Sequence, residues 1–263
     1  MKLNSLTEPF ADDALSVDDF IGGAVKIAQP LSGYRAGVDP VLLAASVPAR
    51  AGQTVLELGC GGGVASLCLG RRVADLTLCG VEVQTRYADL AERNALRNGI
   101  AFEVHCADLN DLPASVKARR FDHVIANPPY FDRARGVAAQ NSERETGLGE
   151  QTSLEKWVKV ASKRLAPKGH AHFVQRADRL PELMAAMQRY VGTPEVQPLY
   201  ARTGRASHLV IVRAKKDGRA DFCLHAPIIM HEGAVHDENS KNYNELIEAV
   251  LRHGAALKFG RKT

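Results

Sequence analysis

Short apolar runs alternate with longer amphipathic stretches between residues 54 and 176. The apolar runs have the length of strands and are rich in Val, Leu and Ile: TVLELGC, LTLCGVEV, AFEVHCAD, FDHVIAN and HAHFVQR. Nearly continuous apolar strands that take turns with helices are typical of a parallel sheet covered on both faces. The pattern therefore predicts a doubly wound α/β domain with a Rossmann-like sheet.

Two of the intervening stretches carry clear helix signals. Over residues 85–99, TRYADLAERNALRNG, apolar residues recur near the spacing of a helix and Gly99 ends the pattern. The second helix is predicted over 153–169, SLEKWVKVASKRLAPKG, with Ser153 as its N-cap and with Pro167 and Gly169 closing it.

The pattern changes after residue 177. A helix is predicted over 177–191, and the runs EVQPLYAR and SHLVIVRAKK follow with only a short turn-rich connection between them. Two runs joined in this way pair antiparallel, so we expect a hairpin at the end of the sheet. A further extended piece is predicted over 221–232 and a closing helix over 239–254.

The first fifty residues contain an extended piece, GAVKIAQP, and a glycine-containing loop, SGYRAGVDP. The loop leads into a helix, for which we expect Asp39 at the N-cap and Pro40 at the first helical position, where its missing N–H is not needed. No internal repeat or linker is visible, which favours a single domain.

The composition is that of an ordinary soluble domain, with 45% hydrophobic and 24% charged residues among 263. No apolar run approaches the ~20 residues that span a bilayer, and the N-terminus is polar and acidic rather than a signal segment. We therefore expect a cytoplasmic protein. The five cysteines form no C-x-x-C pair and the nine histidines are scattered, so we expect free thiols and no metal site.

The formal charge of +4 and the pI near 8.8 permit a nucleic-acid partner without requiring one. Acidic residues gather before residue 20, whereas basic residues are frequent in the C-terminal third. The basic set comprises Arg202, Arg205, Arg213, Lys215, Lys216, Arg219, Lys258, Arg261 and Lys262. It forms either a phosphate-facing surface or ordinary solvated charges, and the sequence leaves both readings open.

A glycine-rich turn, VLELGCGGGVASL, joins a predicted strand to a predicted helix, which is a common place to bind a nucleotide. A dinucleotide fingerprint needs Gly or Ala three residues after Gly61, where this chain has Val64. Glu57 precedes the loop, and it would repel a diphosphate by roughly 4 kcal/mol for charges about 4 Å apart at an effective dielectric constant of about 20. The ligand is therefore expected to carry positive groups and no phosphate.

Two further acids close the next two strands. Glu82 lies 21 residues after Gly61, near the spacing at which an acid binds ribose hydroxyls, and Asp108 ends the following strand. Taken singly, each is more often a helix cap or a solvated charge. Together with Glu57 they line one edge of a parallel sheet and suit a ligand with ammonium, sulfonium, ribose and adenine amine groups. S-adenosylmethionine carries all four, and it is the cofactor that we predict.

Asn127-Pro128-Pro129-Tyr130 follows the next strand and reaches the same edge. An exocyclic amine such as adenine N6 is a poor nucleophile because its lone pair is delocalised into the ring. The Asn127 side-chain oxygen and the Pro128 carbonyl would accept its two N–H groups, and the prolines would hold that carbonyl without adding donors. Tyr130 would stack on the extruded base. The alternative is a simple turn with an aromatic plug.

The motifs ELGCGGG, VEVQ, CAD and ANPPY, in this order, resemble those of class I amino-methyltransferases that modify exocyclic amines and amides. The segment DDFIGGAVKIAQPLSGYRAGVDPVLLAASV before the glycine loop, and PIIMHEG with a short helix at the end, are similar to the bacterial tRNA(Val) adenine-N6 methyltransferase family. Members of that family methylate the adenine 3′ of the anticodon.

The resemblance implies roles for eleven residues. Glu57, Gly59 and Gly61 would hold the methionine part of S-adenosylmethionine, Glu82 its ribose and Asp108 its adenine, while Arg35 and Asp39 would close over it; Asn127, Pro128, Pro129 and Tyr130 would hold the target amine, with Asn127 also next to the cofactor.

The resemblance also implies a seven-stranded sheet whose last hairpin is antiparallel. We expect one methyltransferase domain over 1–263, with an N-terminal extension and cofactor-covering loop at 1–50, a catalytic core at 51–215 and a C-terminal strand and helix at 216–263. The implied partner is tRNA, with no membrane and no metal, and the chain is expected to be a monomer or a weak homodimer.

Three rival functions share some of these features. Release-factor glutamine methyltransferases use the same N-P-P-Y corner, but they carry a helical domain before the glycine loop that this pattern does not predict. Other adenine-N6 methyltransferases act on rRNA or DNA, and those that act on DNA usually need an added target-recognition segment, for which the sequence shows no room. A catalytically silent RNA-binding protein would not need the Asn127 and Tyr130 that are present here.

Overall fold

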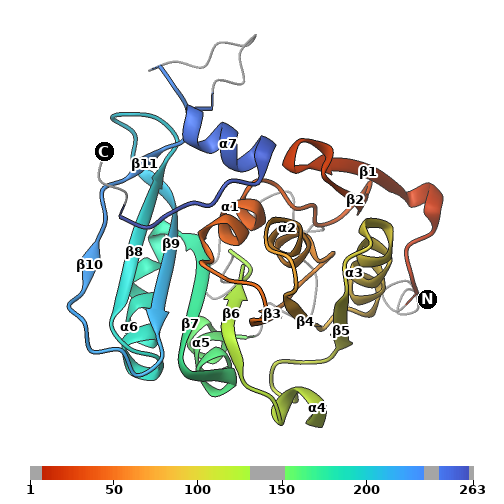
Figure 1. Cartoon of the computed structure of the whole chain (residues 1–263), viewed down its shortest axis with the longest axis horizontal. Coiled ribbons are helices and arrows are strands. Elements are labelled where there is room, and N and C mark those ends of the chain that lie inside the picture. The colour runs from red at the N-terminus through yellow and green to blue at the C-terminus, as the bar shows by residue number, and fades with distance from the viewer. Residues whose placement is uncertain (1–7, 131–151, 234–242, 261–263) are drawn as a thin grey trace, which may run out of the picture.

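A computed structural model describes residues 8–130, 152–233 and 243–260 of the chain. Helices cover both faces of one central sheet, and a separate two-stranded sheet lies beside it (Figure 1). The doubly wound α/β architecture predicted from the alternating pattern is confirmed. No helix within these ranges is long and apolar enough to cross a membrane.

Seven strands form the main part of the central sheet, in the order β8-β9-β7-β6-β3-β4-β5. They are β3 (Thr54–Leu58), β4 (Thr77–Glu82), β5 (Phe102–Cys106), β6 (Phe121–Ala126), β7 (Leu165–Arg176), β8 (Pro194–Tyr200) and β9 (Ser207–Lys215). Strands β3 to β7 are all parallel to one another, and β9 is antiparallel to both β7 and β8. This confirms the antiparallel hairpin at the end of the sheet.

Two short strands extend the sheet beyond this set. The extended piece predicted over 221–232 contains β10 (Cys223–Leu224) and β11 (Ile228–Ile229), which both pair parallel with β8. They bring the described sheet to nine strands, with the seven predicted strands as its main part.

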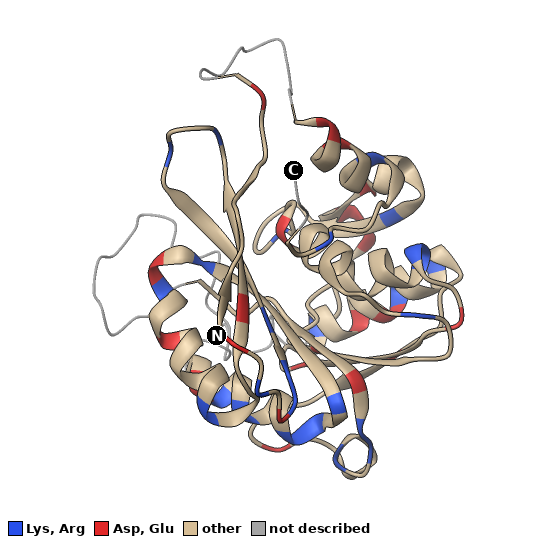
Figure 2. Cartoon of the chain, turned by 60° about the vertical axis from the view of Figure 1, so that its left-hand side comes forward, with Lys and Arg blue, Asp and Glu red and all other residues tan. Residues whose placement is uncertain are grey.

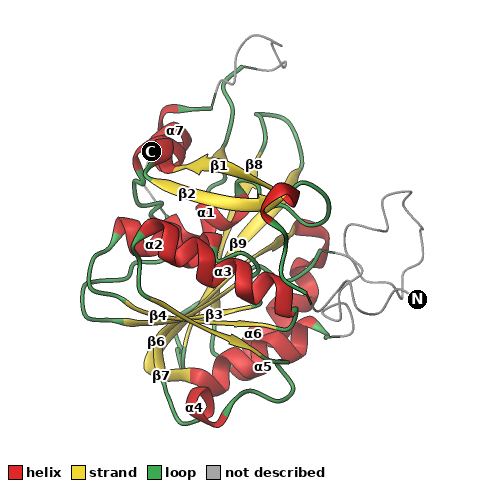
Figure 3. Ribbon diagram, turned by 90° about the vertical axis from the view of Figure 1, so that its right-hand side faces the viewer, coloured by secondary structure: helices red, strands yellow, loops and turns green. Residues whose placement is uncertain are grey.

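The helices divide between the two faces (Figure 3). One face carries α1 (Asp39–Ser46), α2 (Val64–Arg72), α3 (Thr85–Asn98) and α7 (Glu245–His253), and the other carries α4 (Ala114–Lys117), α5 (Leu154–Arg164) and α6 (Leu180–Tyr190). Each face buries its own apolar cluster against the strands. Because both faces are covered, most side chains of the central strands β3, β4 and β6 are buried, as the sequence pattern predicted.

The helix predicted over 85–99 is confirmed as α3, and Gly99 ends it with φ of 61°. Ser153 caps α5 as predicted, since its side chain accepts a hydrogen bond from the Lys156 N–H at 3.3 Å. The predicted end of α5 at Pro167 and Gly169 was wrong: the helix ends at Arg164. Leu165 already begins β7, where it pairs with Phe121 of β6.

A hairpin of β1 (Leu15–Phe20) and β2 (Val25–Pro30) forms the separate sheet. The sequence predicted β2 as an isolated extended piece and did not identify β1. The buried side chain of Asn94 in α3 joins the hairpin to the core, because it accepts from the Ala28 N–H at 2.8 Å and donates to the Ala28 carbonyl at 3.1 Å.

Among the described residues, Lys and Arg are spread over several helices, strands and loops (Figure 2). The β7–β9 register places Ser207 next to the carboxyl end of β7 and Lys215 at its opposite end. Arg202 and Arg205, in the β8–β9 turn, therefore lie at the carboxyl edge of the parallel strands. Arg213 lies toward the opposite end and pairs with Glu195 at 2.9 Å. The members Arg202, Arg205, Arg213 and Lys215 of the basic set are thus divided between two edges of the sheet, whereas Arg261 and Lys262 lie outside the described residues.

Candidate active site

A cavity of about 400 Å³ lies at the carboxyl edge of β3, β4, β5 and β6. All eleven residues to which the sequence assigned a role line it, although they come from segments as far apart as residues 35 and 130. Its volume is in the range of sites for small molecules and cofactors. Convergence on one cavity is the geometric condition that a common site requires.

The glycine loop between β3 and α2 forms one wall. Gly59 and Gly61 have φ of 61° and 51°, which side chains rarely adopt. A Cβ on Gly59 would also overlap the indole ring of Trp157 from α5. The side chain of Asn94 in α3 also holds the loop, because it donates to the Gly62 carbonyl at 2.9 Å. Glycine at 59 is therefore required both by the backbone and by the space.

Glu57 lies at the N-terminus of α2. Its Oε2 accepts from the backbone N–H of Ser66 at 3.0 Å and from the Ser66 hydroxyl at 2.5 Å. Burial raises the pKa of Glu57 to about 8, against the opposing effect of the Ser66 hydrogen bonds. The carboxylate occupies the helix N-terminus, where a dinucleotide-binding fold places its diphosphate. This wall of the cavity is therefore unsuited to a phosphate.

Glu82 ends β4 as the sequence predicted, and it is only 6% exposed. Its two oxygens accept from the backbone N–H groups of Gly61 and Gln84, both at 2.9 Å. Burial raises its pKa, although these backbone bonds act in the opposite direction. Glu82 therefore joins the glycine loop to the loop after β4 while also lining the cavity.

Asp108 follows β5 by two residues rather than closing it. Its Oδ1 accepts from the backbone N–H of Asn110 at 2.7 Å and from the Asn110 side chain at 3.0 Å. These bonds shape the loop that brings Leu109 to the cavity wall. The loop after β5 thus brings an acidic side chain, Asp108, and an apolar one, Leu109, to the cavity.

Asn127 follows β6 and faces the cavity from the other side. Its side-chain amide has no hydrogen-bond partner among residues 8–130, 152–233 and 243–260. The carbonyls beside it are held from behind: Gln175 donates to Pro128 at 3.5 Å, and Arg179 donates to Pro129 at 3.3 Å. The described part of the chain contains no cis peptide bond. The corner therefore presents a free amide on a fixed backbone.

Tyr130 donates a short hydrogen bond from its hydroxyl to the Asp39 carboxylate. Burial raises the pKa of both groups, and the Asp39 charge raises that of Tyr130 further. Asp39 was expected to be the N-cap of α1, but Val38 is the N-cap and no side chain caps the helix. The Asp39 carboxylate instead ties the loop before α1 to the corner after β6.

Arg35 lines the cavity, but its guanidinium points to the β1–β2 hairpin. It donates to the Ser16 hydroxyl at 2.9 Å, the Pro30 carbonyl at 2.8 Å and Asp18 at 2.5 Å. Arg35 therefore fixes the loop over residues 32–38 to the hairpin. Closure of this loop over a ligand stays a prediction.

Four aromatic residues of the cavity were not assigned a site role from the sequence: Phe10, Tyr34, Tyr87 and Trp157. The Tyr87 hydroxyl donates to the Tyr34 carbonyl at 3.1 Å and accepts from its N–H at 3.0 Å. The ring of Phe10 packs edge-on to Tyr87, with the Arg86 guanidinium 3.6 Å from its centroid. The only available signals were a lone aromatic in a polar N-terminus and an aromatic on the α3 stripe, and both are equally typical of a core.

Comparisons with known proteins agree with this architecture. Residues 36–198 match the family model described as methyltransferase small domain. The tRNA1(Val) (adenine(37)-N6)-methyltransferase of Actinobacillus succinogenes is 28% identical over 86% of this chain and 91% of its own length. The protein of the same description from Porphyromonas gingivalis (strain ATCC 33277) is 31% identical over 62% of this chain and 63% of its own length.

Solved structures show the same fold. A predicted O-methyltransferase from Agrobacterium tumefaciens is 26% identical, with a TM-score of 0.67 over 84% of this chain and 98% of its own. A 16S rRNA N2 G1207 methyltransferase from T. Thermophilus shares the fold at 20% identity and a TM-score of 0.53, over 77% of this chain and 50% of its own. Because the family model spans more than half of the sequence, this chain belongs to the methyltransferase small domain family.

Proposed function

We propose that this protein transfers a methyl group from S-adenosylmethionine to the exocyclic N6 amine of an adenine in tRNA. The observation that carries the proposal is the corner at residues 127–130, whose free Asn127 amide faces the same cavity as Glu57 and Glu82. One half of the cavity suits a cationic nucleoside, and the other half suits an amine that must be held by hydrogen-bond acceptors.

The residues of the first half fit the cofactor for physical reasons. Gly59 leaves no room for a side chain beside Trp157, so the backbone itself forms the wall. Among the described residues Glu57 accepts hydrogen bonds from Ser66 alone, and a cationic group would offset the cost of burying that carboxylate. When bound there, S-adenosylmethionine would supply an electrophilic methyl group to the amine nitrogen and leave as the neutral thioether, S-adenosylhomocysteine, while the extra proton on nitrogen would pass to water.

The second half holds the acceptor. The Asn127 side-chain oxygen and the Pro128 carbonyl accept the two N–H groups of the amine, which directs the nitrogen lone pair toward the methyl group. Gln175 holds the Pro128 carbonyl in place, and Asp39 holds the Tyr130 ring as a wall against the base. These groups align and polarise the amine, and the reaction needs no general base with a tuned pKa because the methyl donor is a reactive sulfonium.

Relatives favour tRNA as the substrate, since their name assigns them adenine 37 of tRNA1(Val) and the chain covers 91% of the relative from Actinobacillus succinogenes. Arg205, in the β8–β9 turn at the same edge of the sheet, is exposed and placed to contact a phosphate. Arg179, beside the corner, is instead paired with Glu182 at 2.8 Å and donates to the Pro129 carbonyl. Phosphate contacts of this kind position an RNA without reading its sequence. We place this activity in the cytoplasm, where tRNA is found.

A transfer assay with tritiated S-adenosylmethionine tests the proposal. The full chain is incubated with bulk tRNA from a strain that lacks the enzyme and, in parallel, with purified release factors. We expect label in the tRNA only, and digestion of that tRNA should yield labelled N6-methyladenosine. Labelled release factor with unlabelled tRNA would instead establish methylation of a glutamine side chain, and label in neither acceptor would overturn both assignments.

A further inference from the structure

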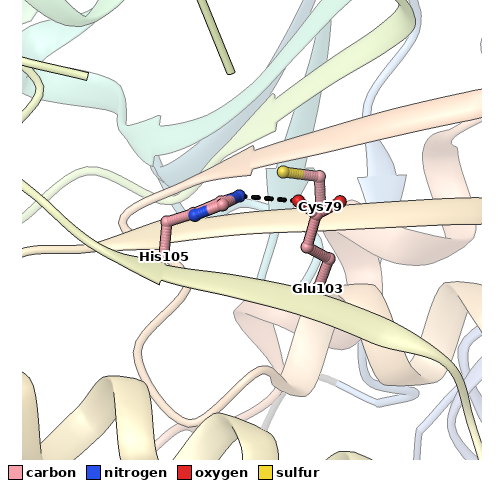
Figure 4. A group of neighbouring side chains, drawn as sticks. All are labelled: Cys79, Glu103 and His105. Carbon is pink, nitrogen blue, oxygen red and sulfur yellow. Dashed lines mark hydrogen bonds and ion pairs between the residues drawn. The ribbon is translucent and has the colours of Figure 1, made fainter. Parts of the chain in front are cut away.

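A second group of reactive side chains lies outside the cavity, on β4 and β5 (Figure 4). Cys79 of β4 and Glu103 of β5 are direct partners in the parallel ladder, and His105 lies two residues further along β5 on the same face. Figure 4 shows the thiol, the carboxylate and the imidazole pointing toward one another. One donor atom from each lies within 4.8 Å of the other two.

The Glu103 carboxylate turns one oxygen toward His105, while its other oxygen is held by a hydrogen bond from Arg119. Its Oε1 lies 2.8 Å from His105 Nε2, and its Oε2 accepts from Arg119 at 2.6 Å. The Arg119 hydrogen bond is the main reason that the pKa of Glu103 is lowered, so this group is ionised at neutral pH. Arg119 is itself held over the ring of Phe121, at 4.9 Å from its centroid. Carboxylates that bind metals commonly accept a second hydrogen bond in this way.

The group is reached from solvent through its two polar members. The side chains of His105 and Glu103 are 21% and 47% exposed, whereas Cys79 beneath them is fully buried. Burial, and then the Glu103 charge, raises the pKa of the Cys79 thiol to about 11. A cation placed between the three groups would reverse the effect of that charge and release the thiol proton.

We propose that Cys79, Glu103 and His105 form a binding site for a divalent transition metal of the zinc type, with a fourth position left for water. Sulfur, imidazole nitrogen and carboxylate oxygen together suit Zn²⁺ or Co²⁺ rather than Mg²⁺ or Ca²⁺. Binding forms bonds from Sγ, Nε2 and Oε1 to the ion and releases one proton from the thiol, with no change of oxidation state. The Cys79 sulfur needs to approach the other two donors by up to about 1 Å, and the 2.8 Å contact between Glu103 and His105 needs to open slightly, to reach ordinary metal–ligand geometry.

The bound ion would fasten β4 to the edge strand β5. The carboxyl ends of these two strands carry Glu82 and the loop with Asp108, so the ion would stabilise one wall of the cavity from below. The site does not depend on the proposed methyl transfer. The sequence did not predict this site, because Cys79, Glu103 and His105 have no metal-binding spacing along the chain and only the strand register brings them together.

Cobalt binding to the full-length, reduced and metal-free protein tests the site. We expect Co²⁺ to give a near-ultraviolet thiolate-to-metal absorption band that saturates at one ion per chain and is displaced by Zn²⁺. Cys79→Ser should remove the band, and His105→Gln should weaken the apparent affinity at least tenfold. The matched control is Cys106→Ser, which removes the exposed thiol next to His105 and should leave both band and affinity unchanged.

No band in the wild-type protein, or a band that persists in Cys79→Ser, would overturn the proposal. Because Cys79 is buried and its replacement can disturb folding, His105→Gln provides an independent test at a partly exposed side chain. Zn²⁺ should raise the Tm of the wild-type protein and of Cys106→Ser but not that of His105→Gln. An equal rise in all three would show that the ion binds elsewhere.

Discussion

Replacing Glu57 with glutamine separates the charge of this residue from its hydrogen bonds. In the wild-type chain one oxygen accepts from both the N–H and the hydroxyl of Ser66. Glutamine keeps a carbonyl oxygen that can accept the same two bonds and has almost the same volume. The variant therefore tests whether the negative charge of Glu57, rather than its hydrogen bonds to Ser66, is what binds a cationic ligand at the N-terminus of α2.

The magnitude follows from proton linkage. The pKa of Glu57 is about 8 in the folded chain and near 4.5 in the unfolded chain, so the folded state binds one more proton between these values. A carboxyl group with a raised pKa contributes its full stabilisation to the folded state below the pKa of the unfolded chain. This stabilisation is lost as the pH rises through the pKa of the folded chain. One such group changes the free energy of unfolding by roughly 1.4 kcal/mol per pH unit. The wild-type chain should therefore lose about 3.5 kcal/mol relative to Glu57→Gln between pH 5 and pH 8, slightly less than three full units of this slope because titration levels off near each pKa.

Urea unfolding of both proteins at several pH values between about 5 and 8 measures this difference directly. Other titrating groups cancel because the two proteins share them. Calorimetry should also show that S-adenosylmethionine binds the wild-type chain more tightly as the pH rises toward 8, with release of a proton, and binds Glu57→Gln weakly at every pH. A difference in unfolding free energy that stays constant with pH would contradict the raised pKa of Glu57, because the residue would then ionise as it does in the unfolded chain.

Three other changes have defined outcomes. Gly59→Ala should lower the free energy of unfolding, measured by urea unfolding, by about 1–3 kcal/mol more than Gly99→Ala. Both glycines have φ of 61°, but only a side chain at 59 would overlap the indole ring of Trp157, so equal losses would exclude the steric effect. Tyr130→Phe removes the hydroxyl that ties the corner to α1, and kcat/KM for tRNA should fall at least tenfold while S-adenosylmethionine binding is retained; unchanged kcat/KM would contradict this role. Arg205→Ala should weaken tRNA binding in a filter assay and reduce its salt dependence, whereas Lys215→Ala, an exposed charge at the opposite edge, should not; equal effects would place the RNA elsewhere.

The parts of the fold that the sequence predicted are those with local causes. The stripe of α3, its terminal Gly99 and the Ser153 cap of α5 depend on neighbours within one or two turns, and all three are confirmed. The end of α5 was wrong because Leu165 pairs with Phe121, more than forty residues earlier, and this pairing begins a strand before the proline can act as a stop.

The same contrast holds for the cavity. The acids and the corner were predictable because the ends of parallel strands must meet at one edge. The link between Asp39 and Tyr130 was not predictable, since it joins segments on opposite sides of the glycine loop through a side-chain contact. The aromatic residues Phe10 and Trp157 gave no signal that distinguishes a cavity wall from a core, because their role depends on which segments pack together and not on spacing along the chain.

The most direct test of the proposed methyl transfer is the rate of transfer to tRNA by Asn127→Ala, measured beside its affinity for S-adenosylmethionine. No described residue hydrogen-bonds the Asn127 amide, so the variant should fold normally and bind the cofactor with nearly unchanged affinity. We predict that transfer falls by about 10²–10³-fold, the usual effect of losing one hydrogen-bonding group that aligns a reacting centre. Transfer at the wild-type rate, or a loss that merely follows weaker cofactor binding, would contradict the assignment of Asn127 to the reacting amine.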